Sequence, residues 1–169
     1  DAAPTATCSI SRTWVAGVSS AAQIGAYVQR KSGATFAFTG TGKYGASVAG
    51  FRLTFDGKTY TREGNGSIPH PQILGSGTMA YTYTVTDSRA LSREYSGSLT
   101  VPAWTEPKIA QFAIVRVRSD GTEAVDGTYA LASVQATISS SKVSGAEKNG
   151  ISYYIRYREA GTETWTNGD

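Results

Sequence analysis

Hydrophobic and polar residues alternate with a period of two through much of this 169-residue chain. The alternation is clearest at residues 51–55, 81–85 and 95–101. A period of two is that of a β-strand with one buried face. The Asp-Gly pair that follows residue 55 supplies the positive φ angles of a tight turn. We therefore predict a hairpin at 51–61 and a second at 81–101 that turns at residues 87–90.

The side chains expected in the core lie on one face of each predicted strand, including a further strand at 34–39. They are Phe36, Phe38, Phe51 or its neighbours Leu53 and Phe55, Tyr81, Tyr83, Val85 and Leu99. Residues 62–77 are rich in Gly and Pro and are predicted to form a loop.

The pattern restarts after residues 102–107, a short segment with a proline at each end. Further strands are predicted at 109–117, 129–138 and 151–157, and a turn at Gly161 then leads to residues 164–166. The second half repeats the order of features seen in the first half: a glycine-aromatic pair, a strand, a Gly/Ser-rich connection and an aromatic strand.

We predict an all-β chain that holds one complete domain plus a partial or small second domain. The first is an immunoglobulin-like antiparallel β-sandwich at residues 1–103, close to the usual size of such a domain. A linker follows at 104–107. The second immunoglobulin-like domain occupies 108–169 and is expected to be truncated.

The composition agrees with this reading. Charged residues make up 17% of the chain and the net charge is +3, with 19 Gly and 10 Tyr. Thr and Tyr favour strands, and Gly favours turns. The basic residues are scattered, so we expect an ordinary solvated surface and no nucleic-acid partner. No stretch resembles a membrane span, so no membrane insertion is expected.

Candidate chemistry is sparse. The single histidine, His70, lies between two prolines, in a segment expected to be extended and exposed. The single cysteine, Cys8, is expected to be a small core residue and not a reactive thiol. No Gly-x-Ser-x-Gly elbow or zinc-ligand spacing is present. We expect no catalytic residue, no metal and no cofactor, hence no enzyme, although a pair of carboxylates that meet in space would allow glycan cleavage.

Two features remain as candidate sites. Asp87 either organises its hairpin by accepting backbone hydrogen bonds or forms a ligand-binding pair with Arg89; we favour the hairpin role. Four aromatic residues have no obvious inward face and form a candidate interaction surface: Trp14, Tyr44, Trp104 and Tyr154. Exposed aromatic side chains stack on sugars or anchor protein interfaces. Packing under a loop or at the domain junction is the more frequent role, and it is expected above all for Trp104, which lies in the linker.

Residues 81–89, YTYTVTDSR, resemble a signature of repeated domains in phage proteins. These are minor structural, tail-associated proteins of siphophages and related prophages, in which Val and Thr precede Asp-Ser-Arg-Gly. Further matches, in the family's order, are Ser76-Gly77, Pro107, Arg116, Arg118, Gly127-Thr128-Tyr129 and Asn149-Gly150. The chain departs from the pattern at two places. Residue 90 is Ala, where the family usually has Gly. Residues 104–106 differ from the family's usual arrangement, in which Pro stands three positions after an aromatic residue.

The resemblance implies tandem immunoglobulin-like modules in a virion tail and no catalytic residues. The expected function is that of a structural or adhesion module, a spacer or host-surface contact, in the virion or outside the cell and encoded in a bacterial prophage. Expected partners are other tail proteins, further copies of the chain, or a host surface glycan. The alternative is a bacterial carbohydrate-binding or cell-surface adhesin module.

Overall fold

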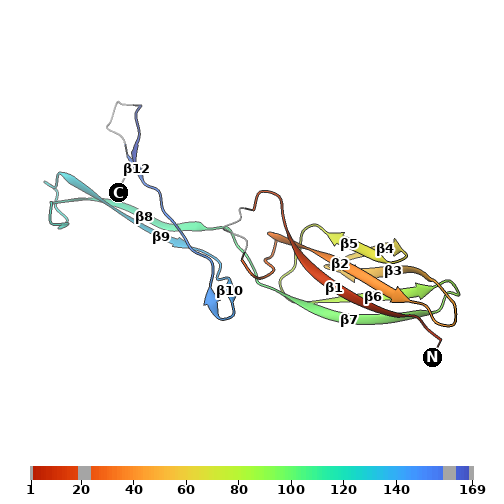
Figure 1. Ribbon diagram of the computed structural model, residues 1–169. Helices are drawn as coiled ribbons and strands as arrows, with labels where there is room; N and C mark the ends of the chain where they lie inside the picture. The colour runs from red at the N-terminus through yellow and green to blue at the C-terminus, as the bar shows by residue number, and fades with distance from the viewer. Residues whose placement is uncertain (1, 19–23, 158–162, 168–169) are drawn as a thin grey trace. The chain divides into compact units, whose positions relative to one another are not determined.

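A computed structural model describes residues 2–18, 24–157 and 163–167, and these residues form strands and loops without a helix (Figure 1). The all-β prediction is therefore confirmed for the described residues. Nowhere in these ranges does a helix occur that is long and apolar enough to cross a membrane. The strands are β1 Thr5–Trp14, β2 Ser32–Thr41, β3 Val48–Phe55, β4 Lys58–Glu63, β5 Gly66–His70, β6 Gly77–Asp87, β7 Ser92–Val101, β8 Lys108–Val117, β9 Tyr129–Thr137, β10 Lys142–Val143, β11 Ala146–Glu147, β12 Arg156–Tyr157 and β13 Thr166–Asn167.

The chain divides into two compact units. The first unit comprises Asp1–Thr105 and Ser139–Lys148, and the second comprises Glu106–Ile138 and Asn149–Asp169. The short hairpin of β10 and β11 thus belongs to the first unit, although the sequence pattern assigns it to the second domain.

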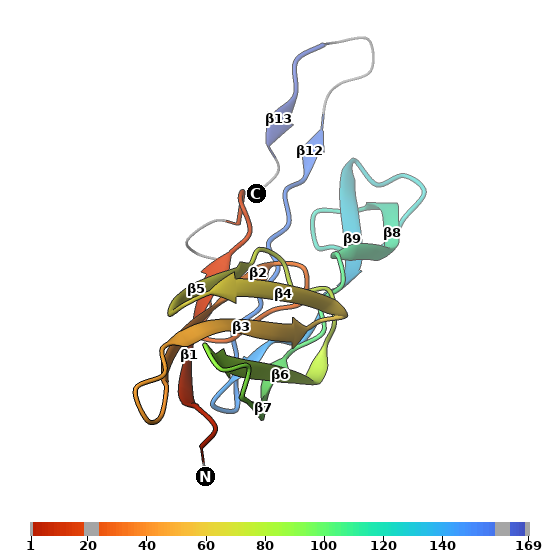
Figure 2. The ribbon, with the colours of Figure 1, turned by 90° about the vertical axis from the view of Figure 1, so that its right-hand side faces the viewer.

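The first unit is built from two antiparallel sheets that stack in the manner of a β-sandwich (Figures 1 and 2). One sheet has the strand order β1-β2-β5, and the other has the order β4-β3-β6-β7. The predicted hairpins are β3–β4 and β6–β7. Asp56 and Gly57 connect β3 to β4 with φ angles of 50° and 70°, as the Asp-Gly pair predicts.

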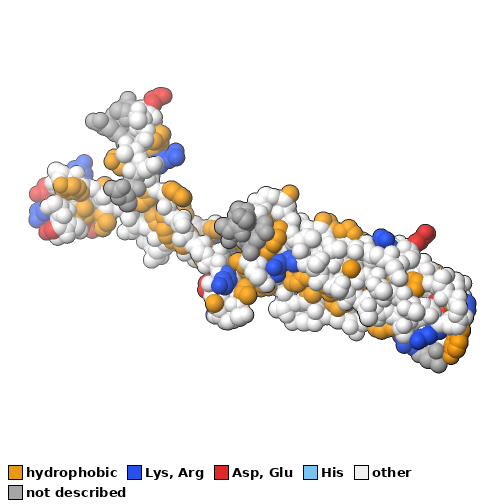
Figure 3. Space-filling model, viewed as in Figure 1, with side chains coloured by type: hydrophobic (Ala, Val, Ile, Leu, Met, Phe, Trp, Pro, Cys, Tyr) orange, Lys and Arg blue, Asp and Glu red, His pale blue; other side chains and the backbone are white. Residues whose placement is uncertain are grey.

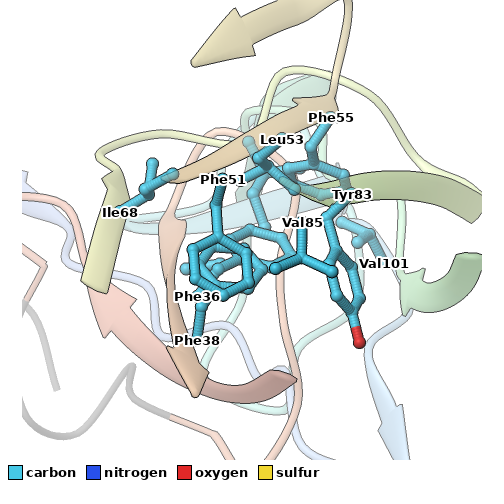
Figure 4. Packing of buried hydrophobic residues seen from close by; sticks show 11 residues of the cluster. Phe36, Phe38, Phe51, Leu53, Phe55, Ile68, Tyr83, Val85 and Val101 are labelled. Carbon is cyan, nitrogen blue, oxygen red and sulfur yellow. The ribbon is translucent and has the colours of Figure 1, made fainter. Parts of the chain in front are cut away.

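Aromatic side chains fill the space between the two sheets (Figure 4). The rings of Phe36 and Phe55 are 5.2 Å apart between centroids, and those of Phe38 and Phe51 are 4.9 Å apart. The predicted core is confirmed: Phe36, Phe38, Phe51, Leu53, Phe55, Tyr83 and Val85 are buried, and Tyr81 and Leu99 pack against them partly buried.

The outer faces of both sheets carry hydroxyl side chains. In β1 and β7 most inward positions carry apolar residues, and most outward positions carry Ser or Thr. The exposed hydroxyl residues include Thr7, Ser9, Ser11, Thr13, Thr39, Thr41, Thr54, Thr59, Thr61, Ser92, Ser96, Ser98 and Thr100. In Figure 3 much of the visible surface of this unit is white, the colour of the backbone and of side chains that are neither hydrophobic nor charged, with hydrophobic side chains between. Within β1 to β7, all of which the structure describes, every aromatic side chain is buried or partly buried.

The structure also differs from the sequence prediction at three places. β1 is a strand that the alternation did not reveal. The loop predicted at 62–77 contains β5, which pairs with β2 as an edge strand. Residues 151–155 are not in a strand, and only Arg156 and Tyr157 of the predicted segment pair with β13. The expected turn at Gly161 lies outside the described residues.

The second unit contains a two-stranded antiparallel ribbon, β8–β9, as predicted. Its register places Phe112 opposite Val134 and Ile114 opposite Ala132. A bulge after Ile109 keeps that residue opposite Ala136. Among the described residues of this unit, neither strand pairs with a third strand, and only the end of β8 forms an isolated bridge, between Val117 and Glu123.

Candidate functional site: polar clusters and exposed aromatic residues

The Asp87 carboxylate organises the turn between β6 and β7. Its Oδ1 atom accepts hydrogen bonds from the backbone N–H groups of Arg89, at 2.9 Å, and Leu91, at 3.1 Å. Its Oδ2 atom accepts from Nη2 of Arg89 at 2.7 Å and from Nε at 3.2 Å. The prediction that Asp87 organises its hairpin is therefore confirmed, and Arg89 completes the same arrangement.

The charge of Asp87 is held in place by these contacts. The hydrogen bond from the Arg89 side chain lowers the pKa of Asp87, burial opposes it, and the two backbone N–H groups lower it further. The side chain of Asp87 is fully buried, whereas that of Arg89 is about one third exposed. Both carboxylate oxygens of Asp87 thus accept hydrogen bonds from its own hairpin, and neither is free for a ligand.

Ala90 completes this turn in a left-handed conformation, with φ of 63°. An L-residue with a Cβ atom is strained there, whereas glycine is not.

His70 is fully buried, so the prediction of an exposed histidine is wrong. The reason is the strand β5: Ile68 and His70 face the core, and Pro69 between them faces outward. A proline is tolerated there because β5 is an edge strand.

His70 joins Tyr60 and Asp56 in a closed polar cluster. The Tyr60 hydroxyl lies 2.8 Å from Nδ1, and Oδ2 of Asp56 lies 3.2 Å from Nε2. A ring with its hydrogen on Nε2 donates to Asp56 and accepts from Tyr60, so the three groups satisfy one another. Burial, followed by the nearby charge of Asp56, raises the pKa of Tyr60. This cluster therefore contains no activated phenolate and no exposed base.

Asp56 also fixes the chain that follows β5. Its carboxylate accepts the backbone N–H groups of Leu74, at 2.6 Å, and Gly75, at 3.0 Å. Burial raises the pKa of Asp56, but these bonds together with His70 outweigh it and hold the pKa below the ordinary 3.8. From the sequence, Asp56 is recognisable only as a turn residue. Its hydrogen bonds join it to His70, Leu74 and Gly75, which lie 14 to 19 residues away, so no short sequence pattern marks this role.

Cys8 lies partly buried beside the aromatic core. Burial raises the pKa of its thiol to about 11. The thiol is therefore protonated at neutral pH, which removes the nucleophilic form, and the expectation of a packing role is confirmed. Within the described ranges, no group of three or more His, Cys, Asp and Glu side chains is placed to hold a metal ion.

The four candidate aromatic residues lie in unlike places. Tyr44 is 80% exposed in the loop after β2, and Tyr154 is 93% exposed in the second unit. Trp14 is partly buried at the end of β1, with the Arg12 guanidinium 5.2 Å from the centre of its ring. Trp14 and Tyr44 lie at opposite ends of the β1–β2 pair, so they do not form one stacking platform.

Trp104 is held by the first unit. Nζ of Lys31 lies 3.7 Å from the centre of its ring, and its backbone N–H donates to Oε1 of Gln29 at 3.1 Å. The backbone N–H of Gln29 in turn donates to the carbonyl of Pro102 at 3.0 Å. These contacts give Trp104 a packing role and leave its ring partly buried.

The second unit exposes a set of large apolar side chains, some of them in the segment 151–157 that was predicted to be a strand. They are Ile109, Phe112, Ile114, Val125, Tyr129, Leu131, Ile151, Tyr153, Tyr154, Ile155, Tyr157 and Trp165. A hollow of about 540 Å³ is lined by residues 107–109, Phe112, Val134, Ala136 and residues 150–156. Apolar surface on this scale is characteristic of an interaction site.

Comparison of the chain with protein-family models, with curated proteins and with solved structures finds no match.

Proposed function

We propose that this chain is a non-catalytic structural module of a phage or prophage tail-associated protein, in which the first unit acts as a spacer. The observation that carries the proposal is the contrast between the inside and the outside of that unit. Its charged and titratable clusters around Asp87 and His70 are used for internal contacts. Its two outer sheet faces present mainly Ser and Thr hydroxyl groups. Outer sheet faces on which no aromatic residue of β1 to β7 is exposed offer few apolar contacts to other molecules, which suits a spacer.

The strand order supports an immunoglobulin-like topology for the first unit. In that fold two antiparallel sheets of about seven strands pack face to face. Here β1, β2 and β5 would correspond to strands A, B and E, and β3, β6 and β7 to strands C, F and G. β4 pairs with β3, as the added strand of the variable-type domain does.

The Asp-Ser-Arg segment supports the phage assignment in a physical way. The resemblance rests on residues whose side chains shape the β6–β7 turn. A motif with a folding role fits a family whose members share a module and differ in what they contact.

The carbohydrate-binding alternative is favoured by the exposure of Tyr44 and Tyr154 alone. Stacking on a glycan generally uses an exposed aromatic face. The sheets of the first unit offer Ser and Thr in place of such a face, so we place this alternative second.

Antibodies raised against the first unit test the proposal. Phage particles should be induced from the source bacterium, purified and examined by immunogold electron microscopy. Labelling of the tail is expected. Labelling of the cell envelope, with none on particles, would contradict the proposal. Polysaccharide binding by the chain should be compared with binding by its Tyr44→Ala variant. Binding by the chain that the variant loses would support the adhesin alternative.

A further inference from the structure

We propose that Arg12, together with Trp14 and Tyr27, forms a site in the first unit that binds the carboxylate group of a sugar acid. Arg12 and Trp14 lie near the end of β1, and Tyr27 lies before the start of β2. The inference follows from the contacts of these three side chains and does not depend on the proposed tail function.

Arg12 is a charged residue on the inward-facing side of a strand. The alternation of β1 places it on the same face as Ile10 and Trp14, and its partner in β2, Ala34, is fully buried. Among the described residues β1 pairs with β2 alone, so it forms an edge of its sheet. A long side chain at such an edge buries its stem and keeps its charged end near the surface. Arg12 is accordingly only partly buried.

The guanidinium group of Arg12 lacks an acceptor. Its Nε atom is buried and has no hydrogen-bond partner in the described part of the chain. The ion pairs between described residues join other groups, so none of them supplies a carboxylate to Arg12. An arginine is charged at every physiological pH, and a buried donor without an acceptor is destabilising. The site therefore has an unmet requirement for an anion.

Two aromatic rings lie beside this guanidinium. Its Cζ atom is 5.2 Å from the centre of the Trp14 ring and 5.8 Å from the centre of the Tyr27 ring. Aromatic rings at this distance attract the cation and restrict the orientation of its planar group. They satisfy no N–H donor, because a ring face is not a carboxylate. The rings thus orient the donors of Arg12 and leave them available to a ligand.

Tyr27 does not act as the missing anion. Burial raises the pKa of Tyr27 above its ordinary 10.0, and the nearby charge of Arg12 opposes this rise only in part. The Tyr27 hydroxyl is therefore neutral at neutral pH, and the charge of Arg12 stays uncompensated.

The arrangement of charge and rings defines the class of ligand. A guanidinium presents paired N–H donors in one plane, which match the two oxygen atoms of a carboxylate. Trp14 and Tyr27 are partly exposed, so they offer apolar ring surface beside the charge. The apolar face of a sugar stacks on such a surface. A sugar that carries a carboxylate uses both parts of the site, whereas acetate or a neutral sugar uses one.

Nuclear magnetic resonance of the full chain, labelled with nitrogen-15, tests the site directly. Titration with sodium glucuronate should shift the Nε–H signal of Arg12 and the indole N–H signal of Trp14 until both saturate. Acetate should need higher concentrations, and glucose should leave the Arg12 signal unchanged. Arg52 is exposed on the outer face of β3, so its Nε–H signal is the internal control and should not move.

Three results of these titrations would contradict the proposal. The absence of a saturable shift at Arg12 would overturn the site. A shift that sodium chloride reproduces at the same ionic strength would show screening in place of binding. Equal responses to acetate and to glucuronate would overturn the assignment to a sugar acid.

Variants of the full chain identify the group that binds. Arg12→Lys keeps the charge but loses the paired donors, so it should weaken glucuronate binding by about tenfold. Arg52→Lys is the matched control and should bind as the wild type does. Tyr44→Ala should also bind normally, because Tyr44 lies at the opposite end of the β1–β2 pair. Undiminished binding by a folded Arg12→Lys variant would refute the site, and the wild-type titration decides the matter if that variant does not fold.

Discussion

The Nη2 atom of Arg89 lies 2.7 Å from Oδ2 of Asp87 and 2.9 Å from the backbone carbonyl oxygen of Ala2. One guanidinium thus ties the β6–β7 turn to the beginning of the described chain. Because Asp87 is fully buried, its charge relies on Arg89 and on two backbone N–H groups for compensation.

Removal of this carboxylate should destabilise the first unit. We expect Asp87→Ala to lower the melting temperature by several degrees, since Arg89 and two backbone groups lose their acceptor. Asp126→Ala is the control, because Asp126 forms an exposed pair with Arg118 and such pairs contribute little. Differential scanning fluorimetry measures both. Equal, small shifts would show that the buried pair has no special role.

The left-handed Ala90 predicts a stabilising substitution. Ala90→Gly should raise the free energy of unfolding by about 0.5–1 kcal/mol, because glycine adopts φ of 63° without steric strain. Ala80→Gly in the middle of β6 should have the opposite sign, since glycine weakens a strand interior. Urea unfolding gives both values. Destabilisation by Ala90→Gly would mean that the turn does not hold residue 90 in this conformation.

The two buried carboxylates predict a loss of stability in acid. The pKa values of Asp56 and Asp87 are lower in the folded chain than their ordinary 3.8, so the unfolded chain binds more protons at low pH. Their contribution is complete above about pH 5 and is lost as the pH falls through 3.8 toward the folded pKa values. Urea midpoints measured from neutral pH to about pH 3 should fall steeply below pH 4. The difference between wild type and Asp56→Asn should shrink over the same range, and a constant difference would contradict this assignment.

The core predicts a large cost for a single truncation. Leu53 is fully buried between the sheets, so Leu53→Ala should cost about 2–5 kcal/mol of unfolding free energy. Its neighbour Thr54 faces outward, and Thr54→Ala should cost less than about 1 kcal/mol. The two variants differ by one position in the same strand. Chemical unfolding that gave similar costs would show that the inward and outward faces are misassigned.

The sequence predicted most clearly where the alternation was strong and the turn was local. The β3–β4 and β6–β7 hairpins, their inward residues and the role of Asp87 follow from residues close together in the chain. β1 was missed because three of its inward positions carry small or charged side chains, Ala6, Cys8 and Arg12, beside Ile10 and Trp14.

The errors at β5 and at residues 151–155 share a physical cause. Pairing of β5 with β2 is a long-range contact that overrides a local preference for loop at Pro69. Residues 151–155 show the opposite case, since they have strand alternation but no partner strand among the described residues. The His70 cluster could not be foreseen, because its members come together only when β5 packs.

Hydrogen–deuterium exchange of the full chain tests the central claim, a closed sandwich core in the first unit beside a thin, exposed ribbon in the second. We predict that amides of β2, β3 and β6 exchange slowly. Amides of β8 and β9 should exchange much faster, because this ribbon pairs with no third strand among the described residues and leaves large apolar side chains exposed. Protection of β8 and β9 that equals that of β3 would contradict the account.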